Sequence, residues 1–389
     1  MRLFINRPVF QLALAQALMM SVNTLLITSS AIIGFGLAED KALATLPLAL
    51  QFLATMLGSL PASLIMQRFG RKGGFLLASA LGLGGSLVAV LALIGQSFAL
   101  FCLATSLFGL YTAFGNYFRF TAAEVAPPSH RDQAISLVLA GGVAAALIGP
   151  NLASYSKGFL SVDFLGSFLA VALIYALNLV NFLAMKLPLP DNPAIIRSAR
   201  PLGEIIAQPG YITALLAATV GYSVMSLLMT ATPLAMMQQH AFSDVAFVIE
   251  WHVLGMFAPS FFTGRLIQRF GARRIVAAGA LAFIACISIN LSGTSVMHYW
   301  LALFLLGIGW NFMFIGGTSL LTETYTEAEK AKAQGFNDLV VFSSVTLASL
   351  GAGALQHAWG WQTVNLMVLP LIAFSLTAVF WVHRPGRAA

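Results

Sequence analysis

Long apolar runs recur along the whole of this sequence. Each is about twenty residues or longer, and short gaps between them hold most of the charged residues. A helix needs about 20 apolar residues to cross the hydrocarbon core of a bilayer. The chain is 59% hydrophobic, against the roughly 45–50% of soluble domains. These features predict an integral, multi-pass membrane protein.

Charged residues and Pro/Gly-marked breaks divide the chain into twelve predicted spans. Their approximate bounds are 9–38, 42–66, 74–95, 98–125, 133–156, 164–186, 209–236, 246–267, 275–294, 298–322, 334–355 and 362–382. The first run is much longer than the roughly 7–15 apolar residues of a signal peptide, so it is predicted to be a span. The proline-rich stretch 187–208 is predicted to be a cytoplasmic linker between an N-terminal half, 1–186, and a C-terminal half, 209–389.

The basic residues orient these spans. With the N-terminus in the cytoplasm, eighteen of the 20 Lys and Arg residues fall on the cytoplasmic side, and only Lys41 and Lys157 lie outside. This bias follows the positive-inside rule, so both termini are predicted to be cytoplasmic. The net charge of +7 then reflects membrane topology and not nucleic-acid binding. The expected location is the plasma (inner) membrane of a bacterium.

One basic phrase occurs twice. The sequence QRFG begins at Gln67 and again at Gln268, 201 positions later, and Gln133 and Gln334 share the same offset. The chain is therefore interpreted as a tandem duplication of a six-helix unit. Internal repeats of this kind are typical of secondary transporters, which bind substrate near the midplane of the membrane.

Three motifs support a family resemblance. The first phrase matches a loop motif G-x-x-x-D-R-x-G-R-K at Arg68, Gly70, Arg71 and Lys72, and the second at Gly264, Arg269, Gly271 and Arg273. Ser63 replaces the first glycine of the motif, and Gln67 and Gln268 replace its acid. The motif A-E-x-x-P-P-x-x-R-x-x-A matches at Ala123, Glu124, Pro127, Pro128, Arg131 and Ala134. Together with the duplication, these motifs resemble those of the major facilitator superfamily over the whole chain. The resemblance implies an all-α membrane protein with twelve transmembrane helices in two six-helix bundles.

A set of residues at the predicted cytoplasmic ends, together with a Gly-Pro pair in span 5, is predicted to act in gating. Gly70 would permit a tight turn with a φ that other residues resist. Asp338 is predicted to close a latch with Arg68 or Arg71, although simple helix capping also explains it. Inside-facing charge without a gating role is the alternative for the basic residues. The full set is Gln67, Arg68, Gly70, Arg71, Glu124, Arg131, Gly149, Pro150, Gln268, Arg269, Gly271 and Asp338.

Polar residues inside the spans are functional candidates because burying them in lipid is costly. The predicted substrate-binding residues are Asn23, Asn116, Arg119, Tyr222, Trp310 and Asn311. Helix–helix hydrogen bonding and aromatic packing are the alternatives for most of them, and a snorkelling side chain is the alternative for Arg119. In this family's fold, spans 1, 4, 7 and 10 are expected to line the central cavity.

The direction of transport is less constrained. Gly149 and Pro150 in span 5 resemble a motif of antiporters, which favours a proton-coupled exporter of a small organic molecule. Thr105, however, stands where many proton-coupled exporters carry an arginine. Glu250 is predicted to be the proton-coupling carboxylate, through desolvation that would raise its pKa. A position at the wet outer lip, or direct contact with a cationic substrate, is the alternative. Uptake by a symporter or facilitator, or a non-transporting scaffold or sensor, are the other readings.

Nothing in the sequence indicates an enzyme. The six histidines are scattered, no H-E-x-x-H motif or phosphate loop occurs, and Cys102 and Cys286 lie alone in apolar runs. No cofactor and no metal are predicted. The predicted partners are a small-molecule substrate, protons and the lipid bilayer, with a monomeric chain.

Overall fold

A computed structural model describes residues 6–40, 43, 46–156, 158, 160–187 and 199–381. Within these ranges the chain is almost entirely helical and has no strand. Both chain ends and residues 188–198 of the predicted linker lie outside the described residues. Eight helical segments in the described part are long and apolar enough to cross a membrane. The count of twelve spans and the cytoplasmic termini stay predictions.

The chain divides into two compact units. The N-terminal unit comprises Ile5–Pro127 and Gly141–Arg197, and the C-terminal unit comprises Pro128–Ala140 and Ser198–Ala389. Among the described residues of the two predicted halves, this division differs at one segment, 128–140, which contains the start of span 5. That segment belongs with the C-terminal unit because its polar side chains bond to residues of that unit.

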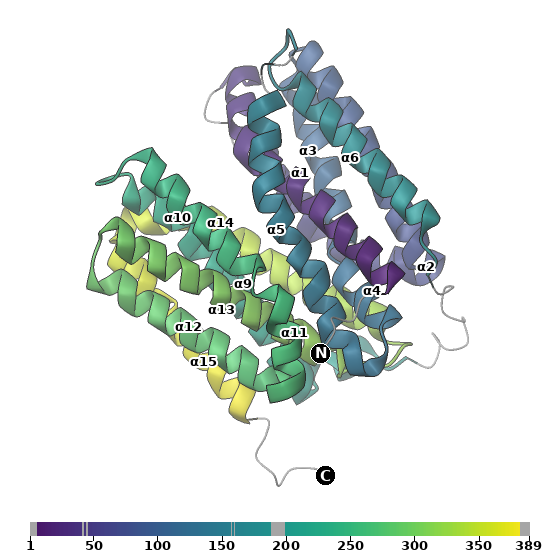
Figure 1. The fold of residues 1–389 in the computed structure, drawn as a ribbon, viewed down its shortest axis with the longest axis vertical. Coiled ribbons are helices and arrows are strands. Elements are labelled where there is room, and N and C mark those ends of the chain that lie inside the picture. The colour runs from purple at the N-terminus through teal and green to yellow at the C-terminus, as the bar shows by residue number, and fades with distance from the viewer. Residues whose placement is uncertain are drawn as a thin grey trace. The chain divides into compact units, whose positions relative to one another are not determined.

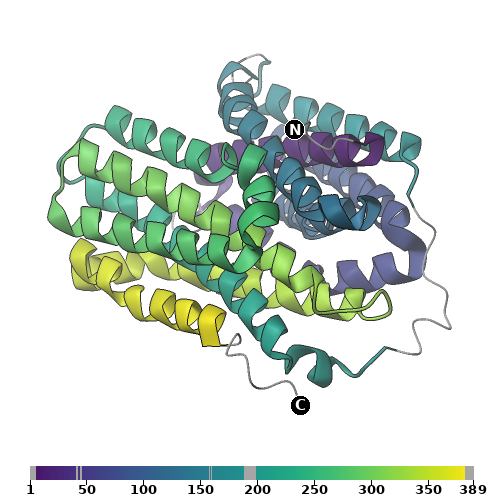
Figure 2. The ribbon, with the colours of Figure 1, turned by 60° about the horizontal axis from the view of Figure 1, so that its bottom comes forward.

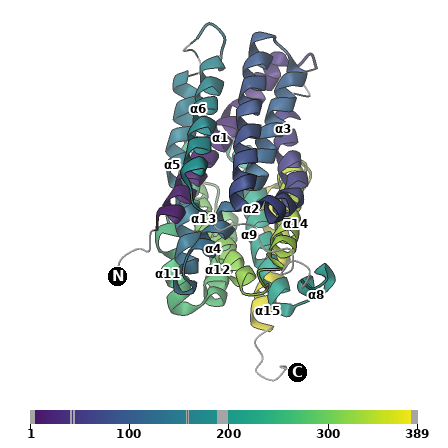
Figure 3. The same ribbon diagram turned by 90° about the vertical axis from the view of Figure 1, so that its right-hand side faces the viewer.

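Long helices build the N-terminal unit. They are α1 (Arg7–Leu37), α2 (Leu46–Ile94), α3 (Phe98–Gly115), α4 (Phe118–Val125), most of α5 (Arg131–Ser156) and α6 (Leu165–Ala184). Helices α2, α3 and α6 pack together, and α1 contacts all three (Figure 3). Asn6 caps the start of α1, where its side chain accepts a hydrogen bond from the Val9 N–H, which satisfies one of the free donors of a helix start.

The C-terminal unit is also built from helices. Its helices are α8 (Leu202–Ile206), α9 (Pro209–Met236), α10 (Phe242–Phe257), α11 (Ser260–Phe270), α12 (Ala272–Ser292), α13 (Val296–Thr322), α14 (Lys330–Met367) and α15 (Leu369–Trp381). Helix α13 packs against α9, α10 and α12 (Figure 1), and the yellow α15 runs beside α12 (Figure 2). The long α14 contains a non-helical residue, Gly360, with φ of 73°.

A single glycine separates the two predicted spans inside α2. At 1.5 Å per residue, its 49 residues would extend roughly 70 Å if straight, more than twice the roughly 30 Å of a hydrocarbon core. Gly70 breaks the helix with φ of 78°, and Gly271 separates α11 from α12 with φ of 85°. Both values lie where a side chain is strained. The turn predicted for Gly70 is confirmed, and its repeat counterpart has the same backbone form.

Glycines also bring helices into close contact. A Cβ added at Gly149 of α5 would lie 2.8 Å from the Ser21 carbonyl oxygen and 2.7 Å from Thr24 Cβ, both in α1. A Cβ added at Gly109 of α3 would lie 2.2 Å from the Gln51 carbonyl oxygen in α2. Such close approach gains the van der Waals contact that holds membrane helices together. Gly149 therefore has a packing role, which was the alternative to an antiporter signature.

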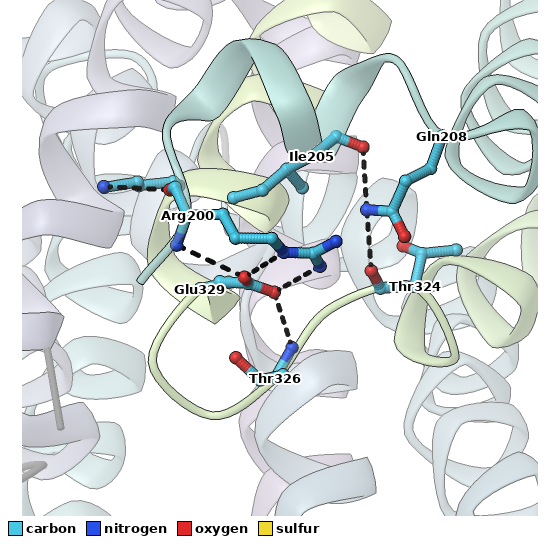
Figure 4. Close-up of polar contacts among 7 residues, drawn as sticks. Arg200, Ile205, Gln208, Thr324, Thr326 and Glu329 are labelled. Atoms are coloured by element: carbon cyan, nitrogen blue, oxygen red, sulfur yellow. Dashed lines mark hydrogen bonds and ion pairs between the residues drawn. The ribbon is translucent and has the colours of Figure 1, made fainter. Parts of the chain in front are cut away.

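The end of the linker is fastened to the segment between α13 and α14 (Figure 4). Arg200 Nε and Nη2 donate to the two carboxylate oxygens of Glu329, at 2.5 and 2.8 Å. Glu329 also accepts from the Thr326 N–H at 3.0 Å, and Gln208 Nε2 donates to the Thr324 carbonyl at 3.1 Å. Paired, bidentate bonds of this kind are among the stronger charge-assisted contacts. They hold α8 to the C-terminal unit.

Candidate substrate site and gating regions

Asn23 lies near the middle of α1 and bonds to two neighbouring helices. Its Oδ1 accepts from Gln51 Nε2 of α2 at 3.1 Å and from Thr112 Oγ1 of α3 at 3.1 Å. Gln51 is buried, and its Oε1 meets no donor among the described residues. The N-terminal unit therefore contains an uncharged polar cluster, which we call the carboxamide cluster: Asn23, Gln51 and Thr112.

The sequence analysis did not include Gln51 and Thr112 among the substrate-binding residues, for two different reasons. Gln51 is a lone carboxamide in the apolar run 42–66, the same signal that selected Asn23, but the expected cavity-lining spans did not include span 2. Thr112 lies in span 4, where a threonine can satisfy its hydroxyl on the helix itself. Its Oγ1 indeed lies 3.0 Å from the Phe108 carbonyl oxygen.

Tyr222 and Trp310 meet in an aromatic cluster of the C-terminal unit. The Tyr222 ring centre lies 5.3 Å from Trp310, 5.2 Å from Phe314 and 5.8 Å from Phe342, each in an edge-on arrangement. Trp310 stacks on Phe314 at an interplanar angle of 15° and lies 5.5 Å from Phe257. Buried indole N–H groups usually have a partner, yet Trp310 Nε1 meets no acceptor in the described part of the chain. We call these five residues the aromatic cluster.

The two repeats pack alike at one pair of glycines. Helices α3 and α13 begin 198 residues apart, at Phe98 and Val296, so Gly109 corresponds to Gly307. A Cβ added at Gly109 would lie 2.2 Å from the Gln51 backbone carbonyl oxygen of α2, and one added at Gly307 would lie 2.5 Å from the His252 backbone carbonyl oxygen of α10. The close helix contact beside Gln51 therefore has a counterpart in the C-terminal unit.

Asn311 forms hydrogen bonds to three residues within the C-terminal unit. Its Oδ1 accepts from Thr263 Oγ1 at 2.7 Å, and its Nδ2 donates to the Met256 carbonyl and to Ser260 Oγ, both at 2.6 Å. The side chain is fully buried. These bonds join α13 to α10 and α11, which favours the helix–helix alternative for Asn311. Its predicted role in substrate binding stays a prediction.

Arg119 is buried at the start of α4, with 3% of its surface exposed. Its Nη1 donates to the Asn116 carbonyl at 2.8 Å, and its guanidinium carbon lies 4.5 Å from the centre of the Phe120 ring, a cation–π geometry. The snorkelling alternative requires the guanidinium to reach water, and this burial prevents it. Asn116 Nδ2 is buried without an acceptor among the described residues.

The motif that contains Arg71 and the motif that contains Glu124 are in contact in the N-terminal unit. Arg71 Nη2 and Nε donate to the two carboxylate oxygens of Glu124, at 2.5 and 3.1 Å. Arg71 also lies 5.5 Å from the centre of the Tyr117 ring. Arg68 and Arg269, at equivalent positions of the two phrases, are exposed and lie over the rings of Phe69 and Phe270. The structure thus pairs two predicted gating residues, Arg71 and Glu124.

The start of α5 bonds to α11 and α13 in the C-terminal unit. Gln133 Nε2 donates to Gln268 Oε1 at 2.6 Å, and Ser136 Oγ donates to the Ser260 carbonyl at 2.5 Å. Asp132 accepts from Ser319 Oγ. A Cβ at Gly264 would lie 2.4 Å from the Asp132 carbonyl oxygen. Gln268, which replaces the acid of the loop motif, therefore forms an amide–amide bond, while Arg131 is exposed.

Two predicted acidic residues have very different surroundings. Asp338 is fully buried in α14, where its Oδ1 accepts from Asn337 Nδ2 at 2.9 Å. Its latch with Arg68 or Arg71 stays a prediction. Glu250 lies on the accessible surface of α10, and its coupling role stays a prediction. Pro150 lies inside α5, and Gln67 is half-buried beside Arg68.

Known proteins share both the sequence and the fold. The profile of the Major Facilitator Superfamily matches residues 12–249 and 214–389. The riboflavin transporter RfnT of Brucella anthropi is 40% identical over 388 residues, which cover 99% of this chain and 98% of the relative. The uncharacterized MFS-type transporter YdeG of Bacillus subtilis is 29% identical over 91% of this chain and 87% of its own.

Solved structures agree on the fold. The E. coli fucose:proton symporter FucP superposes with a TM-score of 0.78 over 96% of this chain and 98% of its own, at 16% identity. The predicted fold class and membrane location are confirmed, and the relatives are transporters, not enzymes. This chain is an integral, multi-pass transporter of the inner membrane, and it belongs to the Major Facilitator Superfamily.

Proposed function

We propose that this protein carries riboflavin, or a flavin with the same ring system, into the cell. The likeness to RfnT carries this proposal, because it holds at 40% identity over 99% of one chain and 98% of the other. At that coverage the likeness spans both repeats of this chain. The chemistry of those clusters supports the same substrate.

The aromatic cluster suits a flat ring system. Riboflavin carries three fused rings with a large apolar face, and aromatic side chains bind such faces by stacked or edge-on contact. Tyr222 is half-buried and lies over the edge of a Trp310–Phe314 stack. Trp310 Nε1, which has no acceptor among the described residues, supplies one donor for a ring nitrogen or carbonyl.

The polar residues at these clusters are uncharged. Riboflavin is neutral at pH 7, so its binding needs hydrogen-bonding groups without a compensating charge. Asn23, Gln51 and Thr112 meet this requirement. Arg119, which would suit an organic anion, bonds to the Asn116 carbonyl and lies over Phe120. A neutral substrate therefore fits this arrangement better than an anionic one.

Uptake is favoured over proton-coupled export by two observations. Thr105 stands in place of the coupling arginine and lies 3.0 Å from the Cys102 carbonyl oxygen. Gly149 serves close packing against α1. The glycine that suggested an antiporter thus has a packing explanation, and the arginine typical of proton-coupled exporters is replaced.

Expression in a bacterium that needs riboflavin and lacks its own riboflavin carrier tests the proposal. Cells that produce the protein should grow on limiting riboflavin and accumulate radiolabelled riboflavin within minutes, while cells with an empty vector should not. Trp310→Ala should abolish the rescue, and Trp359→Ala, which alters an exposed tryptophan, should preserve it at equal protein levels. Failure to rescue, combined with faster loss of preloaded riboflavin, would show export instead.

A further inference from the structure

The hydrogen bonds of the carboxamide cluster orient Asn23. Its Oδ1 accepts from Gln51 Nε2 and from Thr112 Oγ1, which shares its single proton between this oxygen and the Phe108 carbonyl. Asn23 Nδ2 therefore points the other way with two N–H donors. No described residue accepts from that nitrogen. Asn23 is half-buried, so its amide group is not sealed inside a helix interface.

Gln51 adds an unused acceptor beside this donor. Its Nε2 is committed to Asn23, and its Oε1 is buried without a donor in the described part of the chain. Only 3% of Gln51 is exposed, and an unsatisfied buried carbonyl costs about 1–3 kcal/mol. A hydrogen-bond donor on the substrate that pairs with Gln51 Oε1 would explain why this buried acceptor is left open.

The two helices that hold these groups are packed rigidly. Gly109 of α3 lies directly against the backbone carbonyl of Gln51. Thr55 Oγ1 lies 2.9 Å from this backbone oxygen and 3.0 Å from the backbone oxygen of Gly109. Thr112 follows Gly109 by about one helical turn. The seam between α2 and α3 therefore fixes both groups that orient Asn23. Binding groups held in this way discriminate well because little reorganisation is needed.

We propose that Asn23 Nδ2 and Gln51 Oε1 together recognise an imide edge, a carbonyl next to an N–H, on the substrate. Asn23 donates to the carbonyl, Gln51 accepts from the imide N–H, and Thr112 positions Asn23. On the function proposed above, this edge is the pyrimidine side of the flavin ring, where one N–H lies between two carbonyls. The inference rests on that function but assigns a specificity role that a general affinity for flat rings does not require.

The competing explanation is a helix–helix tie, meaning hydrogen bonds that join helices and contact no ligand. The cluster joins α1 to α2 and α3, and the Asn178–Tyr111 bond at 2.8 Å shows that this unit uses such ties elsewhere. A tie affects folding and leaves the choice of ligand unchanged. Ligand preference therefore separates the two explanations.

Binding to the purified full-length protein provides the test, by the quenching of flavin fluorescence. The probes are riboflavin and 3-methylriboflavin, whose methyl group replaces the imide hydrogen. We expect the unmodified protein to bind riboflavin about tenfold more tightly, as the loss of one buried hydrogen bond predicts. Gln51→Met should weaken riboflavin binding about tenfold and leave 3-methylriboflavin binding unchanged, which removes the preference. Asn23→Asp should weaken both ligands and keep the preference.

Asn178→Ala, which breaks a tie of the same kind, serves as the matched control and should keep the preference. Equal binding of the two flavins by the unmodified protein would overturn the inference while the proposed function stands, and this comparison needs no variant to fold. A preference that survives Gln51→Met, or disappears in Asn178→Ala, would overturn it as well. Absence of any flavin binding would reject the proposed function itself.

Discussion

Trp310 combines two properties at the scale of a single residue. It stacks within the aromatic cluster, and its indole N–H is buried without an acceptor among the described residues. Trp310→Phe keeps a ring and removes the N–H. Since a hydrogen bond contributes about 0.5–1.5 kcal/mol, we expect the apparent KM for riboflavin uptake to rise about two- to tenfold. Trp359→Phe, on the exposed tryptophan, is the control, and equal shifts in both variants would argue against a binding role.

Glu250 tests proton coupling directly. Because no described residue bonds to its carboxylate, we expect Glu250→Gln to transport substrate at an unchanged rate in reconstituted vesicles, with or without a pH gradient. The measurement compares gradient-driven accumulation with substrate exchange in the same vesicles. A variant that keeps exchange but loses accumulation driven by the gradient would restore the coupling role that the sequence suggested.

The Arg200–Glu329 contact makes a pH-dependent prediction at the scale of an element. The hydrogen bonds from Arg200 lower the pKa of Glu329 from 4.5 to about 2. A carboxyl with a lowered pKa in the folded state stabilises that state above its ordinary pKa and loses this contribution as the pH falls towards 2. The contact is therefore complete at pH 7 and weakens between about pH 4.5 and 2.

Thermal unfolding measures this effect. Glu329→Gln should lower the unfolding midpoint at pH 7, and the difference from the unmodified protein should shrink as the pH falls below 4.5. Glu327→Gln is a suitable control, since Glu327 is an exposed carboxylate of the same segment. A difference that stays constant from pH 7 to pH 3 would mean that Glu329 contributes through packing and not through its charge.

The elements themselves were largely predictable from sequence. Apolar runs and charged gaps located the helices because both follow from the cost of burying polar groups in lipid. The turn at Gly70 was predictable because few residues other than glycine adopt its φ. The contacts between polar residues were not predictable, because they depend on how the helices pack. Asn311 satisfies its carboxamide on α10 and α11, whereas the equally isolated Gln51 leaves its Oε1 unused.

At the scale of the whole molecule, the start of α5 groups with the C-terminal unit and not with the half that precedes it in sequence. Gly264 permits this arrangement, because an added Cβ would lie 2.4 Å from the Asp132 carbonyl oxygen. Gly264→Ala should separate α5 from α11 and lower the maximal uptake rate about fivefold or more, since overpacking costs about 1–3 kcal/mol. Gly84→Ala, at a helix position with nothing within 4 Å, should have no effect.

Spin labels can follow the separation itself. With Cys102 and Cys286 replaced, labels at the exposed positions Arg131 and Arg269 should report a longer distance in Gly264→Ala than in the unmodified background. An unchanged distance together with an unchanged uptake rate would mean that this contact is incidental to transport.

Gly70 and Gly271 bear on what a duplicated chain must keep while its two copies diverge. Each interrupts the helical backbone with a positive φ, 78° and 85°, in a phrase that both repeats share. A side chain at either position strains the backbone, so mutations there are removed from both copies, while residues that contact a substrate can change in one copy alone. Duplication of this kind keeps the scaffold common to both halves and lets each half evolve its own selectivity.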